Sequence, residues 1–227
     1  MIKKLFLALT AIAAATGAHA STVSYEYGMP LALATTEINQ TGSLSLFDSS
    51  LGTLTGASLQ VFGGAMFGFS GTSRSGGVED ATITSTTSLR WSTSLGALSP
   101  FLTTVADRID LSASSGELEY AVGQTRDFGP FVQNGSHVDD LATILASLQA
   151  TGGGNFDVTC RTVSGLQVLG GGGNINTTQS TSAACGARIT YAFDAPVVSQ
   201  VPEPGSLYLM GMALAGAGFV ARRRKQA

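Results

Sequence analysis

Residues 21–27 read Ser-Thr-Val-Ser-Tyr-Glu-Tyr, and this short stretch carries the pattern that decides the fold. Val23, Tyr25 and Tyr27 alternate with polar residues, which is the two-residue period of a strand with one buried face. Further runs of this kind follow, rich in β-branched or aromatic residues and bounded by Gly, Ser, Asn or Asp. They are residues 42–47, 54–62, 65–69, 81–91, 117–122, 156–163, 165–169 and 188–193. This pattern predicts an all-β domain, either a two-sheet sandwich or a jelly roll, because an α/β fold would need helices between the strands.

One segment departs from the strand pattern. The stretch 136–139 resembles a capping box with Asp in place of Glu, and the apolar residues at and after it fall on one helical face. These residues are Val138, Leu141, Ile144, Leu145 and Leu148. The sequence therefore predicts one short helix that closes an end of the sandwich and stops at the glycines 152–154. The glycine run 170–173 is expected to form a loop or a bulge.

The C-terminal segment, residues 199–227, has an order of elements that a folded domain has little use for. Pro202-Glu203-Pro204 continues neither a helix nor a strand, because each Pro lacks a backbone N–H. Fifteen uncharged residues, 207–221, follow the motif. The chain then carries Arg222, Arg223, Arg224 and Lys225, a charge placement that holds a C-terminal end in the cytoplasm. The apolar run falls short of the roughly 20 residues that span a bilayer comfortably, which disfavours an ordinary tail anchor.

This arrangement resembles the PEP-CTERM sorting signal of exported bacterial proteins, with residues 202–204 as the sorting motif and 222–225 as the basic stop. The resemblance implies recognition by a membrane-embedded exosortase and processing near the motif. It also implies transient anchoring in the inner membrane of a Gram-negative bacterium through a transmembrane sorting segment, and then a place on the cell surface or in the extracellular matrix. The expected partners are the exosortase, the secretion machinery, the membrane and an extracellular polysaccharide.

The N-terminal segment, residues 1–20, agrees with export. Lys3 and Lys4 precede the apolar residues 5–15, and Ala18-His19-Ala20 has the small-x-small pattern of a signal-peptide cleavage site. We expect cleavage between Ala20 and Ser21. The body of the protein is then residues 21–198, which is long enough for one domain.

The body is acidic and poor in cysteine. Residues 21–201 hold fourteen acidic side chains against six arginines and no lysine, a formal net charge of −8. Such a surface repels polyphosphates and argues against a nucleic-acid partner. Cys160 and Cys185 are the two cysteines of the chain. An oxidising compartment favours a disulfide between them, and two separate buried thiols are the alternative. With so few thiols and one His, we expect no metal site and no cofactor.

Several stretches of the body match the motifs of a known domain family. They are residues 47–56 (FDSSLGTLTG), the strand at 57–61, the pair 173–174 and residues 189–193 (ITYAF). These stretches resemble the choice-of-anchor E domains of exported proteins, and the likeness covers about 21–195. Asp48 and Gly52 are expected to shape a turn, with Leu51 and Leu54 packed below it. Phe193 stands where Tyr is more usual in that family. The resemblance to the family implies no known activity.

Catalytic chemistry finds little support in the sequence. The one histidine of the body, His137, lies at the start of the expected helix, where a surface position explains it without catalysis. Carboxylates could act in pairs on glycosides, although solvated surface acids show the same pattern. The candidate pairs are Glu79 with Asp80, Asp107 with Asp110, and Glu117 with Glu119. Asp107 and Asp110 could join a calcium site, but the sequence holds no D-x-D-x-D-G loop.

Aromatic residues offer the last candidate site. Four of them could form a platform for a sugar or could fill the core instead: Tyr25, Tyr27, Trp91 and Tyr120. We therefore expect no enzyme. The favoured function is a structural or interaction role at the cell surface or in the matrix. The alternative is a carbohydrate-binding module for exopolysaccharide, and a glycan-acting hydrolase is the least favoured function.

Overall fold

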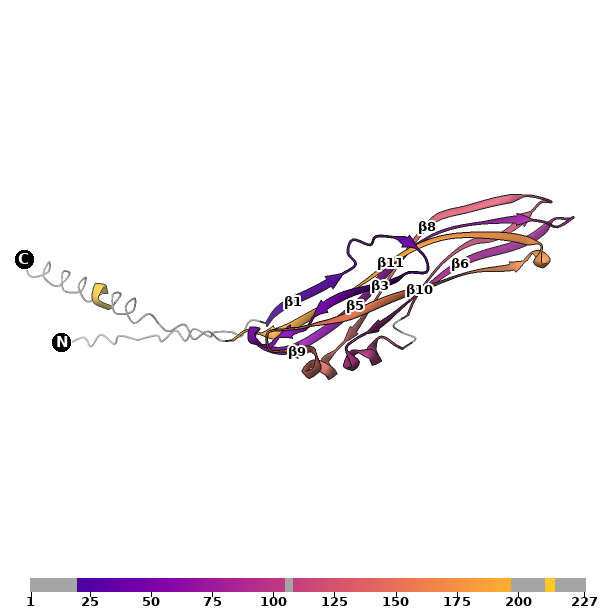
Figure 1. Ribbon diagram of the computed structural model, residues 1–227. Helices are drawn as coiled ribbons and strands as arrows, with labels where there is room; N and C mark the ends of the chain where they lie inside the picture. The colour runs from indigo at the N-terminus through magenta and orange to yellow at the C-terminus, as the bar shows by residue number, and fades with distance from the viewer. Residues whose placement is uncertain (1–19, 105–107, 197–210, 215–227) are drawn as a thin grey trace, which may run out of the picture. The chain divides into compact units, whose positions relative to one another are not determined.

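The computed structural model describes residues 20–104, 108–196 and 211–214 (Figure 1). The chain divides into two units, Met1–Ala195 and Pro196–Ala227. In the second unit, residues 211–214 are helical. Most of the expected signal peptide, the sorting motif at 202–204, the basic stop at 222–225 and Asp107 lie outside the described residues.

The body is built from strands in two antiparallel sheets. The first sheet has the order β1 (Ala20–Tyr27), β11 (Ile175–Asp194), β5 (Thr53–Ser73) and β8 (Thr125–Asp140), and β2 (Ala34–Thr35) also pairs with β11. The second sheet has the order β3 (Asn39–Ser45), β10 (Asn155–Gly170), β6 (Glu79–Thr93) and β7 (Ile109–Tyr120). A short parallel pair joins β4 (Phe47–Asp48) to β9 (Gln149–Ala150). The 3-10 helices are η1 (Ser49–Leu51), η2 (Gly96–Phe101), η3 (Ala142–Leu148) and η4 (Gly171–Gly173).

The strand order makes this body a jelly roll. Of the eight long strands, taken in chain order, the first pairs with the eighth, the second with the seventh, the third with the sixth and the fourth with the fifth. Successive pairs alternate between the two sheets, so the chain behaves as one long hairpin wrapped around a core. The sequence left a sandwich and a jelly roll open, and the pairing decides for the jelly roll.

Several strands are longer than the sequence predicts, among them β11, whose 20 residues include the expected strand 188–193. The expected strands 54–62 and 65–69 are parts of β5, which has 21 residues, and 156–163 and 165–169 are parts of β10, which has 16. In the sequence, a glycine suggested that each of these two strands is interrupted. In β5 the glycine instead allows the two sheets to approach each other. A Cβ at Gly63 would lie 2.1 Å from Leu89 Cδ2 on the opposite sheet. The glycine therefore continues the strand instead of ending it.

The helix expected over residues 136–148 is wrong. Residues 136–140 are the end of β8, where Ser136 lies opposite Phe62 of β5, and the capping box does not form. Only Ala142–Leu148 turns, as the 3-10 helix η3. Leu141 and Leu148 are buried, but Val138 is 58% exposed. Pairing with β5 satisfies the backbone of 136–140, so tertiary contacts override the local helical pattern. β8 itself was missed by the sequence pattern.

The core lies between the sheets. Inward residues of β5 such as Leu59, Val61 and Phe67 pack in one cluster with Ile83 and Leu89 of β6, and all five are fully buried. The glycine run behaves as the sequence predicts: Gly171–Gly173 forms the short turn η4, which connects β10 to β11. Because β10 and β11 belong to different sheets, this turn carries the chain from one layer to the other.

Candidate functional site

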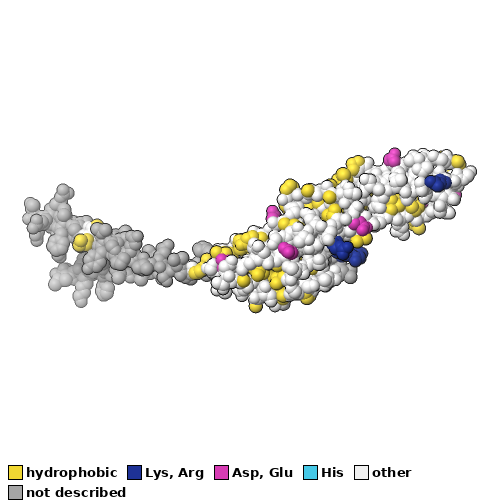
Figure 2. Space-filling model, in the orientation of Figure 1, with side chains coloured by type: hydrophobic (Ala, Val, Ile, Leu, Met, Phe, Trp, Pro, Cys, Tyr) yellow, Lys and Arg dark blue, Asp and Glu magenta, His cyan; other side chains and the backbone are white. Residues whose placement is uncertain are grey.

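The outer face of the second sheet carries a row of three arginines. Arg90 of β6 lies directly opposite Arg161 of β10, so both side chains point to the same face, and both are exposed. Arg108 precedes β7, the strand on the other side of β6, and lines a hollow together with Arg90. We call Arg108, Arg90 and Arg161 the arginine row. In Figure 2 a group of basic side chains is visible on this view of the body, and another basic side chain lies apart from it.

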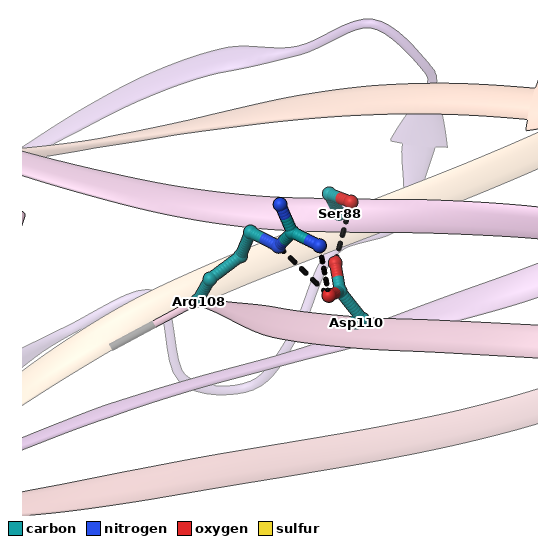
Figure 3. A network of polar contacts seen from close by, with 3 residues as sticks. All are labelled: Ser88, Arg108 and Asp110. Carbon is teal, nitrogen blue, oxygen red and sulfur yellow. Dashed lines mark hydrogen bonds and ion pairs between the residues drawn. The ribbon is translucent and has the colours of Figure 1, made fainter. Parts of the chain in front are cut away.

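One member of the row is held by a carboxylate. Arg108 Nε donates to Asp110 Oδ2 over 2.7 Å, and Ser88 Oγ donates to Asp110 Oδ1 over 2.5 Å (Figure 3). Burial opposes ionisation of Asp110, but these hydrogen bonds and the charges of Arg108 and Arg90 hold its pKa below the usual value. Within the described residues, Arg90 and Arg161 make no hydrogen bond or ion pair.

A hollow of about 310 Å³ lies beside the row. Its walls are Arg90, Trp91, Leu102, Thr103, Thr104 and Arg108. Trp91 is only 4% exposed, and its buried Nε1 donor has no acceptor among the described residues. Thr103 already donates its hydroxyl to the carbonyl of Ser99 over 3.1 Å. Among the described residues that line this hollow, the exposed guanidinium of Arg90 therefore offers free hydrogen-bond donors, whereas the Trp91 donor is buried.

A larger hollow, of about 550 Å³, lies on the outer face of the first sheet. Met29 and Leu31 form one wall, and residues of β5, β8 and β11 form the floor. The floor is lined by Gln60, Phe62, Gly63, Asn134, Gly135, Ser136 and Arg188. Arg188 is neutralised there by an ion pair with Glu26 of β1. This hollow is open and mixed in character, and its one arginine is already occupied.

Of the acid pairs that the sequence put forward, Glu79 and Asp80 point to opposite faces of β6, whereas Glu117 and Glu119 share the outer face of β7. Glu79 accepts a hydrogen bond from Ser75 over 3.0 Å, whereas Asp80 is exposed. Asp80 lies opposite Glu119, and Glu117 points to the same outer face. These three acids stand at the end of β6 away from the arginine row. Within residues 20–104, 108–196 and 211–214, no three His, Cys, Asp or Glu side chains gather where they could hold a metal ion.

His137 also lies away from its expected place. It is in β8 instead of at a helix start, and its Nε2 is 3.3 Å from Asp139 Oδ1. The two side chains are partly buried along one face of the strand. This contact is a local pairing two residues apart, and it is not the helix-terminus arrangement that the sequence predicted.

The aromatic platform does not form. Tyr120 and Trp91 are 0% and 4% exposed and belong to the core, and Tyr25 and Tyr27 pack against it from β1. Burial raises the pKa of the Tyr27 hydroxyl well above its usual range. Trp91 and Tyr25 also line hollows, but two different ones. The structure thus favours the core role for these residues, since large apolar rings are stabilised by burial between the sheets.

The expected turn at Asp48 is present. Asp48 Oδ1 accepts from the N–H groups of Ser50 and Gly152, over 2.9 and 3.0 Å, and the bonds from Ser50 are the main reason that its pKa is lowered. Gly52 has φ of +145°, and a Cβ there would lie 2.1 Å from the carbonyl oxygen of Asp194. Leu54 is buried as expected. Leu51 is 41% exposed, so its expected packing is wrong.

Cys160 and Cys185 form a disulfide, with Cα atoms 6.4 Å apart. Cys160 belongs to β10 of the second sheet and Cys185 to β11 of the first, and both are fully buried. The bond therefore ties the two layers together through the core. The sequence suggested the pair, but not that it crosses the sandwich.

The sequence matches the PEP-CTERM protein-sorting motif over residues 200–225. This match implies an exported protein that is sorted by an exosortase, with processing at a membrane. It does not cover the body, so the resemblance of that part to choice-of-anchor E domains stays a prediction. No helix among the described residues is long and apolar enough to cross a membrane.

Comparisons over the body are weak. No curated protein matches the sequence. The VP2 subviral particle of infectious bursal disease virus is 13% identical, with 87% of this chain and 48% of the viral chain covered and a TM-score of 0.17. The structure of the Gt strain of that virus is 12% identical, with 90% and 48% covered and a TM-score of 0.12. The chain thus spans about half the length of these viral chains.

Proposed function

We propose that this protein is an exported structural or interaction protein of the bacterial cell surface or extracellular matrix. The PEP-CTERM match at residues 200–225 carries the proposal, because that motif implies export and transfer to an exosortase. The body supports it, since a cross-sheet disulfide suits an oxidising exterior. In this proposal a signal peptide is cut between Ala20 and Ser21, residues 199–227 anchor the chain transiently in the inner membrane, and the body is a choice-of-anchor E type domain.

Proposed cleavage is compatible with the fold of the first strand. Ala20 pairs with Asp194 at the very end of β1, and Ser21 pairs with Phe193. Removing residues 1–20 costs one terminal pair and leaves the alternating face of β1 against β11. N-terminal sequencing of protein recovered from outside the cell should begin at Ser21, and an intact Met1 there would contradict signal-peptide cleavage.

The sorting step is tested by replacing Pro202, Glu203 and Pro204 together with Ala. Export should persist, while an unprocessed form accumulates in the inner membrane and protein is lost from the surface or the medium. Replacing Val197 and Val198 with Ala is the matched control, because these positions precede the matched residues 200–225. Parent-like processing and location of the triple variant would refute the assignment of the motif.

We also propose that the body has no hydrolytic activity. His137 is paired locally with Asp139, and Glu117 and Glu119 are exposed on an outer strand face. Purified protein should therefore not turn over polysaccharides, esters or peptides. Turnover that is abolished by His137→Ala or by Glu119→Gln would replace this proposal with a glycan-acting hydrolase.

A second candidate function is a carbohydrate-binding module. The observation that favours it is the hollow that Trp91 lines together with Arg90 and Arg108. Small-molecule sites of this kind combine an apolar wall with a few convergent polar groups. Retention of the protein on the exopolysaccharide of its own organism would support this candidate over a purely structural role.

A further inference from the structure

The arginine row is unusual in a body of this composition. The body holds six arginines and no lysine against fourteen acids, yet three of the six arginines stand on neighbouring strands at one end of a sheet face. Like charges directly opposite each other on paired strands reduce sheet stability, and Arg90 faces Arg161 in this way. The arrangement therefore costs stability in the free protein and would be relieved by a bound anion.

The groups that line the adjoining hollow indicate which chemical class of anion would bind. Arginine side chains only donate hydrogen bonds, and the carboxylate of Asp110 is already occupied by Arg108 and Ser88. A planar carboxylate can accept two parallel bonds from a guanidinium group, which suits arginine better than lysine. The free donors at Arg90 thus fit a carboxylate placed at the mouth of the hollow.

The size and layout of the site favour a chain of sugars as the carrier of the carboxylate. A hollow of about 310 Å³ is at the lower end of ligand pockets, which is the scale of a single sugar unit. Arg161 lies one strand beyond Arg90, about 4.8 Å further across the sheet. A polymer seated in the hollow would cross the sheet toward this second guanidinium, whereas a small acid would leave Arg161 unused.

We propose that the arginine row and its hollow bind an acidic polysaccharide through the carboxylates of its uronic-acid units. In this arrangement Arg90 holds one carboxylate at the hollow, Trp91 forms the apolar wall, and Arg161 meets the next anionic unit. Arg108 stays on Asp110 and positions that edge of the hollow. The three acids Asp80, Glu117 and Glu119 lie at the other end of β6, ten residues or about 33 Å away, and do not oppose the ligand.

This proposal rests on the export part of the proposed function, which would bring the body into contact with polysaccharide outside the cell. The two can fail separately. An Arg90→Gln/Arg161→Gln variant should be exported and processed like the parent, because its sorting segment is unchanged. Loss of binding with normal processing therefore tests the site alone, and a processing defect in the triple Ala variant tests sorting alone.

The experiment measures binding of the purified full chain to polygalacturonate, with dextran as a neutral polysaccharide. The parent should bind polygalacturonate and not dextran. The double variant should bind at least about tenfold more weakly, because each lost charge-assisted contact is worth roughly a factor of ten. Arg74→Gln is the matched control for one charge, since Arg74 is exposed outside the row, and it should change affinity less than about twofold.

Salt and competing polyanions complete the test. Binding should weaken as the salt concentration rises from about 0.01 M to about 0.15 M, because the screening length falls from about 30 Å to about 8 Å. Equal binding to dextran would overturn the proposal, because it would show that binding does not depend on carboxylates. Tighter binding to polyphosphate or to an acidic protein would overturn it in favour of another class of anion. Unchanged affinity of the double variant would overturn it as well.

Discussion

Removing the disulfide tests how strongly the two layers depend on each other. The perturbation is the double variant Cys160→Ala/Cys185→Ala, which breaks the bond between β10 and β11 without leaving an unpaired thiol. The cysteines are 25 positions apart, so the bond closes a loop whose lost entropy in the unfolded chain corresponds to about 3.5 kcal/mol. For a body of this size that free energy corresponds to a lower Tm by about 7 to 14 °C.

The assay is thermal unfolding followed by circular dichroism, with and without a reducing agent. The reductant should lower the Tm of the parent toward that of the double variant and should leave the variant unchanged, which separates the bond from the effect of replacing two buried sulfur atoms. A double variant that melts within about 2 °C of the parent would refute the entropy argument. Two freely alkylatable thiols in natively exported protein would refute the bond itself.

Three further changes test packing and ionisation. Gly42→Ala should lower the free energy of unfolding by about 1 to 3 kcal/mol, because its Cβ would lie 2.0 Å from the Tyr27 ring, whereas Gly76→Ala, with nothing within 4 Å, should be nearly neutral in denaturant titration. Burial of Tyr191 raises the pKa of its hydroxyl, so its contribution to stability is complete below about pH 10. That contribution should fall at higher pH, because the hydroxyl ionises first in the unfolded chain. A Tyr191→Phe variant that loses as much stability as the parent above about pH 10 would contradict this. Asp48 has a lowered pKa, so its contribution is present above about pH 4 and should be lost as the pH falls; Asp48→Asn should flatten the acid limb of a urea-midpoint profile, and an unchanged limb would speak against it.

Short-range pattern was sufficient to predict the fold class and the C-terminal sorting motif. The alternation at residues 21–27 appears in β1 as a half-buried face, because a strand turns successive side chains to opposite sides. The sorting motif can likewise be recognised from the sequence alone, because it is defined by the order of a stiff tripeptide, an apolar run and a basic cluster. The match at residues 200–225 agrees with that prediction.

Strand length and the false helix depended on contacts far apart in the chain. The apolar spacing after Ser136 has a helical period, but β5 supplies hydrogen-bond partners that the sequence does not announce. Glycines such as Gly63 read as strand ends, and their role becomes clear only when Leu89 of the other sheet lies against them. Local propensity lost in both places to pairing and packing that form only in the folded chain.

The candidate site shows the same division. The sequence by itself determined that the body is all-β, acidic, exported and able to form one disulfide, because composition, period and motif order are local properties. It singled out Trp91 and Asp110 but could not place Arg90 opposite Arg161, since strand register depends on turns and on which faces are buried. Only the tertiary structure brought β6, β7 and β10 side by side and led the disulfide through the core from one sheet to the other.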